Sequence, residues 1–337
     1  MTRRLVLTLA LFLALPTLAF AVGRPREPRL APRDVSEVPT YVRRVEPALL
    51  ALRVRAPEEA VSSARLGTQR FATALVFDTR GYAVTVSYAL LDAVHIEAQL
   101  RGGPTVTARL VGLDLETGLG VVKLDGEGPW PAAVLGESRD VQAGNLTGTV
   151  GVDEDNDLNW ATSRVQGIRR FSGYWEYMLD RALIVAPSIE SWGGSAVVDA
   201  WGTVIGIASL RLGDPPHVNV AIPMEKFVAV KDELLAAGRV MSRPPRPWLG
   251  LYTIPRDGAV VVDGFSPLGP AREAGFHRGD RIVSVNGVTV ASQEEFYEQL
   301  WRGRAGDVVR VAVQRAAGVH VIKVQSVDRY RLLRIGR

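Results

Sequence analysis

The sequence predicts a mainly β protein with a large first domain and a small α+β second domain. Short runs of β-branched and apolar residues recur between about 41 and 240 at a spacing of roughly ten residues, which is typical of a β-barrel or sandwich. A Pro-rich segment, residues 242–247, separates this region from a second pattern of strands and helices. The chain has 337 residues, 47% of them hydrophobic and 23% charged, which is sufficient for two hydrophobic cores.

Residues 1–21 have the pattern of a secretory signal peptide. Arg3 and Arg4 precede an apolar run at 5–15, and small residues at the end form a cleavage site, so we expect cleavage after Ala21. The mature protein is therefore expected in the periplasm or cell envelope. The alternative is a retained anchor, because residues 5–22 are barely long enough to span a bilayer. Membrane contact is expected only in that case.

Composition excludes several classes of partner and site. The net charge is +4, but no basic run is interleaved with aromatic residues, so we expect no nucleic-acid partner. The chain contains no cysteine, so it has neither a disulfide framework nor a lipid-attachment site. Residues 22–40 are predicted to be a Pro/Arg-rich linker. The acidic turn 153–157 lacks the glycine and terminal glutamate of a calcium loop, so we expect no metal and no other cofactor.

The first domain begins with a segment, 41–54, that is predicted to start as a short helix and continue as a strand. Residues 56–70 have no clear period and are predicted to be a loop. The strands 71–77 and 82–86 flank a turn closed by Gly81, which predicts a hairpin. Further strands are predicted at 95–100, 106–113, 119–124, 146–152, 161–168, 183–186, 195–198, 204–210 and 218–222.

One strong helix is predicted at residues 224–237, near the end of the first domain. Phe227, Val228, Leu234 and Leu235 lie on one helical face, and Gly238 stops the helix.

The second domain alternates strands, turns and two helices. The order is a strand at 259–262, a short helix within 266–275, a strand and Asn-Gly turn within 279–287, a helix from Ser292 to about Trp301, and a hairpin of 308–314 with 319–325. The second helix starts with a capping box, because Ser292 precedes Glu295 by three residues.

The most informative stretch of the first domain is 186–198, which is followed by a hairpin at 199–208. A polar turn, then Gly193 and Gly194, then an apolar strand is how a trypsin-like barrel presents its nucleophile. The segments 81–90, 114–123 and 220–223 are similar, in this order, to motifs of the HtrA/DegP-like serine proteases.

From about 41 to 330 the chain thus resembles that family. The resemblance implies a trypsin-like double β-barrel at 41–240, a linker at 241–247, a PDZ domain at 248–328 and a basic tail at 329–337.

The same resemblance places unusual residues at the catalytic positions. Tyr88 takes the place of the histidine, Gly118 that of the aspartate and Trp192 that of the serine. A phenol is a poor base at neutral pH, glycine has no side chain, and an indole N–H only donates. Glu190 replaces a glycine of the oxyanion loop. These residues predict that the chain is not an enzyme but a pseudoprotease. Trp192 is expected to pack into the space that the missing groups leave, and the alternative is that it forms the floor of a closed or peptide-binding cleft.

Two alternatives remain open at this point. Ser191 or Ser195 with His217 could form a displaced catalytic set, which would make the chain a serine endopeptidase of envelope protein quality control. The chain could instead be a structural subunit of an active HtrA-like paralogue. The resemblance implies a homo- or hetero-oligomer with HtrA-like proteins, since proteins of this family often form trimers. The usual N-terminal contact segment is not recognisable here.

The resemblance of the second domain to bacterial PDZ domains implies peptide binding. The backbone N–H groups of Leu249, Gly250 and Leu251 would receive a terminal carboxylate. The peptide would add as a strand beside Tyr252, against the helix that carries Phe296 and Leu300. The expected partners are carboxyl-terminal peptides or unfolded polypeptides, and the expected role is that of a binding, scaffold or regulatory protein.

Overall fold

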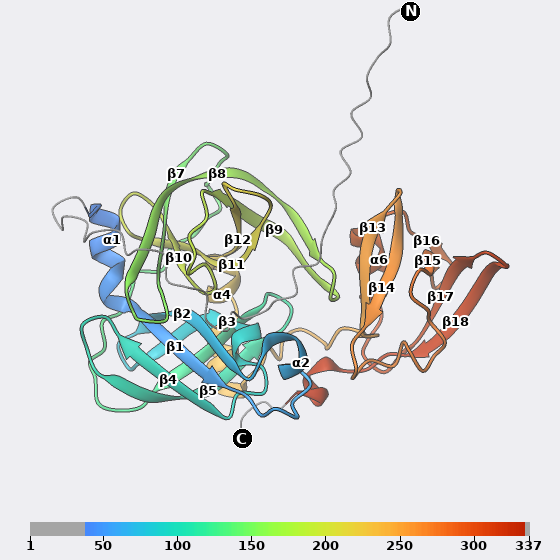
Figure 1. Cartoon of the computed structure of the whole chain (residues 1–337), viewed down its shortest axis with the longest axis horizontal. Coiled ribbons are helices and arrows are strands. Elements are labelled where there is room, and N and C mark those ends of the chain that lie inside the picture. The colour runs from blue at the N-terminus through green and yellow to red at the C-terminus, as the bar shows by residue number, and fades with distance from the viewer. Residues whose placement is uncertain (1–37, 334–337) are drawn as a thin grey trace, which may run out of the picture.

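The computed structural model describes residues 38–333 and confirms a mainly β chain with two domains. Figure 1 shows the larger domain on the left and the smaller, orange and red domain on the right. The predicted signal peptide, most of the predicted 22–40 linker and the last four residues of the tail lie outside the described residues. Within residues 38–333, none of the helices has the length and apolarity that a membrane crossing requires.

The first barrel is a closed sheet in which the strands follow the order β1-β2-β3-β6-β5-β4. The helix α1 (Thr40–Val45) and a 3-10 turn lead into it, as the sequence predicts. The predicted loop at 56–70 contains the short helix α2 (Ser63–Leu66), and α3 (Ser87–Leu90) follows the third strand. The strands are β1 (Leu49–Arg55), β2 (Gln69–Asp78), β3 (Tyr82–Val86), β4 (His95–Leu100), β5 (Thr105–Asp114) and β6 (Leu119–Leu124).

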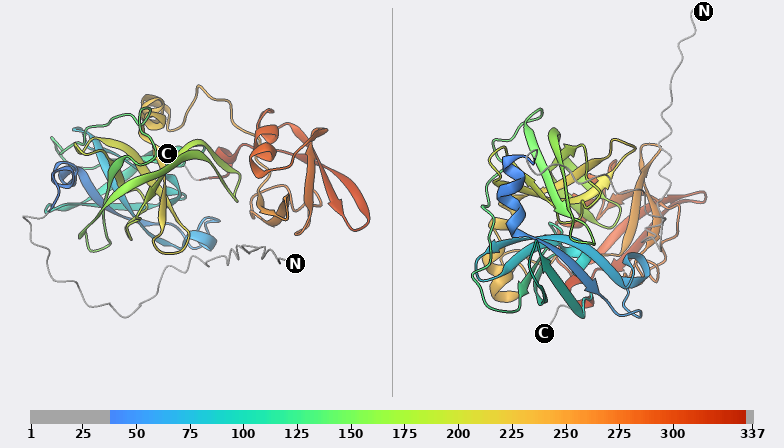
Figure 2. Two further views of the ribbon diagram at one scale, coloured as in Figure 1. Left: turned by 90° about the horizontal axis from the view of Figure 1, so that it is seen from above. Right: turned by 60° about the vertical axis from the view of Figure 1, so that its left-hand side comes forward.

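The second barrel is also closed, in the order β10-β11-β12-β9-β8-β7. Figure 2 shows the two barrels packed against each other, with α1 alongside. The hairpin of β8 and β9 is longer than predicted, and it extends from its barrel toward the C-terminal domain (Figure 1). The strands are β7 (Leu146–Val152), β8 (Leu158–Gly173), β9 (Tyr177–Ala186), β10 (Ala196–Val198), β11 (Val204–Leu212) and β12 (Val218–Pro223).

The predicted helix at 224–237 is instead two short helices, α4 (Met224–Val228) and α5 (Lys231–Ala237). Val230, with φ −125° and ψ −3°, interrupts the helical backbone. Phe227 is fully buried and packs edge-on against Phe77 of the first barrel, with ring centroids 4.9 Å apart. Val228 is 39% exposed, because the interruption changes which residues face the barrels.

The C-terminal domain is a sheet in the order β13-β14-β15-β17-β18, with β16 beside β15. The Ser292 cap is confirmed, because its hydroxyl accepts from the N–H of Glu295. The Glu295 carboxylate accepts from the N–H of Ala291, one residue before the N-cap. The helix predicted within 266–275 is a series of turns, since glycine and proline are frequent there. The elements are β13 (Leu251–Arg256), β14 (Ala259–Phe265), β15 (Arg281–Val285), β16 (Val288–Thr289), α6 (Gln293–Leu300), β17 (Val308–Arg315) and β18 (Gly318–Gln325).

Charged and polar contacts tie the C-terminal domain to the first barrel. Arg243 of the linker pairs with Asp114 at 2.7 Å and with Glu116 at 3.0 Å, and the Asp114 side chain is fully buried. Arg246 pairs with Glu116 at 2.9 Å. After the C-terminal domain, a 3-10 turn (Arg329–Leu332) brings the Tyr330 hydroxyl to the N–H of Leu115.

The turn before β10 joins the two barrels through a close backbone contact. The N–H of Thr73 in β2 donates to the carbonyl of Gly193, and the N–H of Gly194 donates to the carbonyl of Ala208 in β11. Gly194 has φ +86°, and a methyl group built on it would lie 1.9 Å from the Thr73 carbonyl oxygen. Only glycine fits this position, for both conformational and steric reasons.

We therefore expect Gly194→Ala to lower the free energy of unfolding by about 3 kcal/mol or more, through overpacking and a left-handed backbone. Gly144→Ala is the matched control, since Gly144 has φ +90° but no atom near the added methyl group. That control should lose only about 1 kcal/mol. Denaturant unfolding of both variants measures the difference, and equal losses would contradict the proposed contact.

Candidate functional site

The structure brings Tyr88 and Trp192 together where the two barrels meet. Tyr88 is carried by α3, and its ring centroid lies 6.3 Å from that of Trp192, which is half-buried. The Tyr88 hydroxyl donates to the carbonyl oxygen of Ser209 at 3.0 Å. Burial raises the pKa of this phenol, so it remains neutral at physiological pH.

The space beside Gly118 is occupied by Tyr177, a residue that the sequence did not indicate. The Tyr177 hydroxyl donates to the carbonyl oxygen of Thr117 at 2.7 Å, and it lies 3.2 Å from where a Gly118 side chain would begin. Burial raises the pKa of Tyr177 as well. Tyr177 reaches this place from β9 of the second barrel, so only the tertiary packing could identify it.

The serines and the histidine of the alternative catalytic set, Ser191, Ser195 and His217, are not hydrogen-bonded to one another through a serine hydroxyl and the imidazole ring. The Ser195 side chain is fully buried and donates to the carbonyl of Ser191. The His217 ring contacts the carbonyl of Gly213 at 2.6 Å. Among the described residues, no histidine ring is hydrogen-bonded to a serine hydroxyl, and Glu190 is exposed.

A second candidate site is the loop at the start of β13, which holds a carboxylate from the same chain. The N–H of Leu251 donates to one oxygen of the Glu176 carboxylate at 2.7 Å, and the N–H of Leu249 donates to the other at 3.1 Å. Gly250 between them has φ +75° and contacts Gly269 so closely that a side chain would clash. The loop is therefore shaped as the resemblance implies, and its acceptor is Glu176.

Glu176 belongs to residues 173–176, here called the 173–176 tip, which comprise the last residue of β8 and the turn to β9. The carbonyl of Tyr174 accepts from the N–H of Thr253 in β13 at 2.9 Å. The Tyr297 hydroxyl of α6 donates to the carbonyl of Gly173 at 2.7 Å and accepts from the N–H of Glu176 at 3.1 Å. The tip thus lies between β13 and α6, in the position expected for a bound peptide.

The helix residues that contact the tip differ from the predicted ones. Phe296 and Leu300 are 0% and 1% exposed and pack in the core of the C-terminal domain. Tyr297 contacts the tip directly, and Gln293 donates to the carbonyl of Thr253 at 2.6 Å. Both pairs are four residues apart on α6, so helical spacing alone could not decide which pair faces the groove.

Tyr252, which was predicted to border the peptide, does border the tip. Its ring lies edge-on to that of Tyr174, with centroids 5.5 Å apart. The guanidinium of Arg65, from α2 of the first barrel, lies 4.0 Å from the centroid of the Tyr252 ring. The sequence signal for the tip was its pair of aromatic residues, Tyr174 and Trp175, between two strands, but nothing in the sequence indicated where they would lie.

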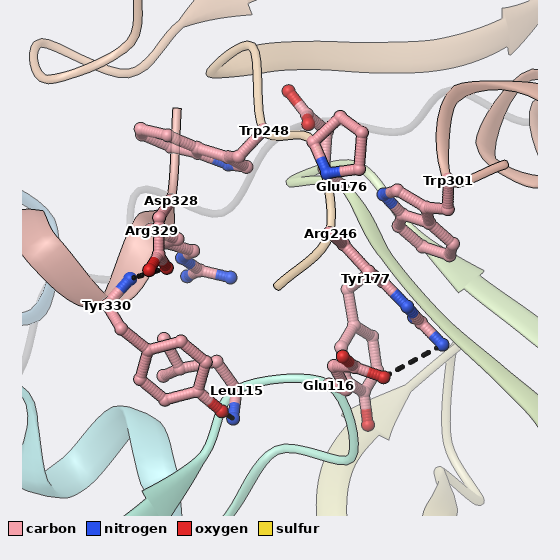
Figure 3. Close-up of a pocket in the computed structure, with 11 residues that line it drawn as sticks. Leu115, Glu116, Glu176, Tyr177, Arg246, Trp248, Trp301, Asp328, Arg329 and Tyr330 are labelled. Carbon is pink, nitrogen blue, oxygen red and sulfur yellow. Dashed lines mark hydrogen bonds and ion pairs between the residues drawn. The ribbon is translucent and has the colours of Figure 1, made fainter. Parts of the chain in front are cut away.

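Glu176 also borders a small pocket between the domains (Figure 3). The positive charge of Arg329, which also lines the pocket, attracts the Glu176 carboxylate. Arg246, Glu116 and Asp328 line the pocket as well. Burial raises the pKa of Glu176 to about 7, and it outweighs the opposing effects of the two loop amides and Arg329. Within residues 38–333, no three His, Asp or Glu side chains are grouped as metal ligands.

This raised pKa predicts how the contact depends on pH. The folded chain binds the proton of the buried Glu176 more tightly than the unfolded chain does. The stability that comes from this protonation is therefore complete below about pH 4.5 and is lost as the pH rises through about 7. Between about pH 5 and pH 7.5, wild type should lose about 2 kcal/mol of unfolding free energy relative to Glu176→Gln. Denaturant unfolding at the two pH values measures this difference.

Glu127→Gln, which changes an exposed glutamate in a distant loop, is the control. Glu127→Gln should lose as much unfolding free energy over this pH range as wild type does. If wild type, Glu127→Gln and Glu176→Gln all show the same pH dependence, the titration of Glu176 is contradicted.

Comparisons with known proteins match both domains. A family model of a trypsin-like peptidase domain matches residues 72–207, and one of a PDZ domain matches residues 247–325. Serine endoprotease DegS of Salmonella typhimurium is 28% identical over 294 residues, covering 81% of each chain. DegS of Escherichia coli K12 is 28% identical over 296 residues, also covering 81% of each.

A probable periplasmic serine endoprotease, DegP-like, of Halomonas elongata is 29% identical over 251 residues, covering 70% of this chain and 52% of the relative. Two solved structures share the fold. The HtrA-type protease AlgW with a decapeptide has a TM-score of 0.54 and 22% identity, covering 88% of this chain and 99% of that one. A serine endoprotease from Yersinia pestis has a TM-score of 0.55 and 24% identity, covering 87% and 99%.

These comparisons correct the prediction that the chain is not an enzyme. The relatives are named serine endoproteases, and the matched first domain is a peptidase domain. Tyr88, Gly118 and Trp192 are differences in side chain within a protease family, and a difference in side chains is not a demonstration of inactivity. The order of a trypsin-like peptidase domain and a PDZ domain, shared with relatives named DegS and DegP-like, makes this chain an HtrA-like protein.

Proposed function

We propose that this HtrA-like protein binds the carboxyl-terminal ends of polypeptides, folded or unfolded, through its PDZ domain. The observation that carries the proposal is the pair of backbone N–H groups of Leu249 and Leu251, which converge on one carboxylate. Amide donors aimed at a carboxylate make charge-assisted hydrogen bonds, which are stronger than those to neutral acceptors. A terminal carboxylate presents the same two oxygens as the Glu176 side chain.

The edge of β13 that no strand covers supports the same function. β13 pairs with β14 on one side only, and on the other side its Thr253 N–H donates to the carbonyl of Tyr174 in the tip. Peptides that add a strand to a sheet edge use main-chain hydrogen bonds of this kind. The groove therefore suits an extended chain that ends beside Leu249 and Leu251.

We place this function in the cell envelope. The pattern of residues 1–21 is that of an exported protein, and a relative at 29% identity is named periplasmic. Assembly with further HtrA-like chains, as a homo- or hetero-oligomer, belongs to the same proposal.

Binding should depend on the terminal carboxylate. A fluorescein-labelled decapeptide with a free carboxyl terminus should bind the mature chain at least about tenfold more tightly than its C-terminally amidated twin, because the amide removes the charged acceptor. Fluorescence anisotropy measures both affinities. Equal affinity for the two peptides would contradict carboxylate recognition.

A second candidate function is peptide hydrolysis, which the names of the relatives favour. The nucleophile would then be a group other than an aligned serine, because Trp192 occupies that position. Ser191 is the nearest candidate, since it precedes Trp192 and is only half-buried, whereas the Ser195 side chain is fully buried.

Under this function, the purified protein cuts unfolded casein, a fluorophosphonate probe labels it, and Ser191→Ala abolishes both. Ser195→Ala is the matched control and should retain activity if it folds, which circular dichroism checks. Casein that stays intact with no probe attached would remove hydrolysis as a candidate and would leave peptide binding unaffected.

A further inference from the structure

We propose that the 173–176 tip is an internal ligand of the PDZ groove, which an external polypeptide end must displace before it can bind. The inference rests on the proposed peptide-binding function and specifies how that site is regulated. It follows from three features of the tip: the atoms it occupies, the conformation of Glu176, and the weakness of the contacts beside it.

The tip uses the donors that an external peptide would need. The N–H groups of Leu249 and Leu251 both point to the Glu176 carboxylate, which is 5% exposed. The N–H of Thr253 is already paired with the carbonyl of Tyr174. Each N–H donates one good hydrogen bond, so the tip and a peptide cannot hold these three groups at the same time.

The backbone conformation at position 176 does not favour a glutamate, so the contact of the Glu176 side chain is the reason for a glutamate here. Glu176 has φ +54°, in the left-handed region where a glutamate costs roughly 1 kcal/mol or more. Glycine or asparagine would suit a turn with this conformation better. A glutamate gains from the position only because its carboxylate reaches the loop amides.

The polar contacts of the hairpin with α6 beside the tip are partly exposed, so they add little to what holds the tip in place. Arg170 and Glu298 form an ion pair at 2.7 Å with side chains 48% and 41% exposed, a kind of pair that contributes little. Ser172 donates to Glu294 at 2.7 Å. Trp175 stacks on Tyr177 of its own barrel, with centroids 5.4 Å apart, so it is held by the hairpin and not by the groove.

The sharpest test removes the internal carboxylate while favouring the same turn. Glu176→Gly keeps the left-handed backbone without strain and frees the amides of Leu249 and Leu251. Asp257→Gly is the matched control, since Asp257 is also an acidic residue at positive φ, +50°, but it lies exposed at the β13–β14 turn. The probe is the labelled decapeptide with a free carboxyl terminus, measured on full-length mature protein.

We expect Glu176→Gly to bind this decapeptide at least about tenfold more tightly than wild type, because no internal ligand competes. Asp257→Gly should bind as wild type does. Measurable binding of the peptide with the same affinity to wild type and Glu176→Gly would overturn the internal ligand and leave the proposed function standing.

Amide hydrogen exchange without any peptide separates the two proposals. The Leu249 and Leu251 amides should exchange more slowly in wild type than in Glu176→Gly, and equal rates would overturn the internal ligand. If the rates differ as expected but neither protein binds the free-carboxylate peptide, docking of the tip is supported and external peptide binding is the part that fails.

A covalent lock gives a second, independent measurement. The natural chain has no cysteine, so Tyr174→Cys with Tyr252→Cys provides two thiols that a short bis-maleimide can join across the tip and β13. Joined protein should lose at least about tenfold in peptide affinity relative to the same variant with its thiols capped singly. Unchanged affinity after joining would overturn the proposal.

Discussion

Two backbone amides, those of Leu249 and Leu251, determine how the two domains of this protein meet. Buried N–H groups need an acceptor, and here the acceptor is the carboxylate of Glu176 from the other domain. The remaining contacts between the domains agree with this placement. Arg243 holds the linker against Asp114 and Glu116, and Tyr330 returns the end of the chain to Leu115. One carboxylate thus connects the peptide groove to the second barrel.

The meeting place of the two barrels shows how the protein accommodates unusual residues in a familiar scaffold. Tyr177 fills the volume beside Gly118, and Tyr88 contacts Trp192. Both phenols have raised pKa values because they are buried, and each donates its proton to a backbone carbonyl. The hydroxyl groups of both tyrosines therefore have hydrogen-bond partners within the protein.

Much of the fold could be predicted from the sequence because local signals agreed with tertiary structure. Hairpins such as β2–β3 follow from apolar and β-branched runs that flank a glycine turn, and the Ser292 cap follows from its spacing to Glu295. Predictions were wrong where packing decides. The helix at 224–237 is interrupted at Val230, and helical spacing selected Phe296 and Leu300 where Tyr297 contacts the tip. Inactivity was inferred from four aligned positions, and the relatives named serine endoproteases contradict it. Nothing local could show that Glu176 lies in the groove.

The docking of the tip within one chain has a quantitative consequence. A segment that the same folded chain holds beside the groove competes at an effective local concentration on the order of millimolar. A free polypeptide end must exceed this tethered rival in affinity or abundance before occupancy changes. In the proposed arrangement, polypeptide ends at low concentration would leave the groove occupied by the tip. External ends would bind only above a threshold concentration, and the geometry of one hairpin sets that concentration.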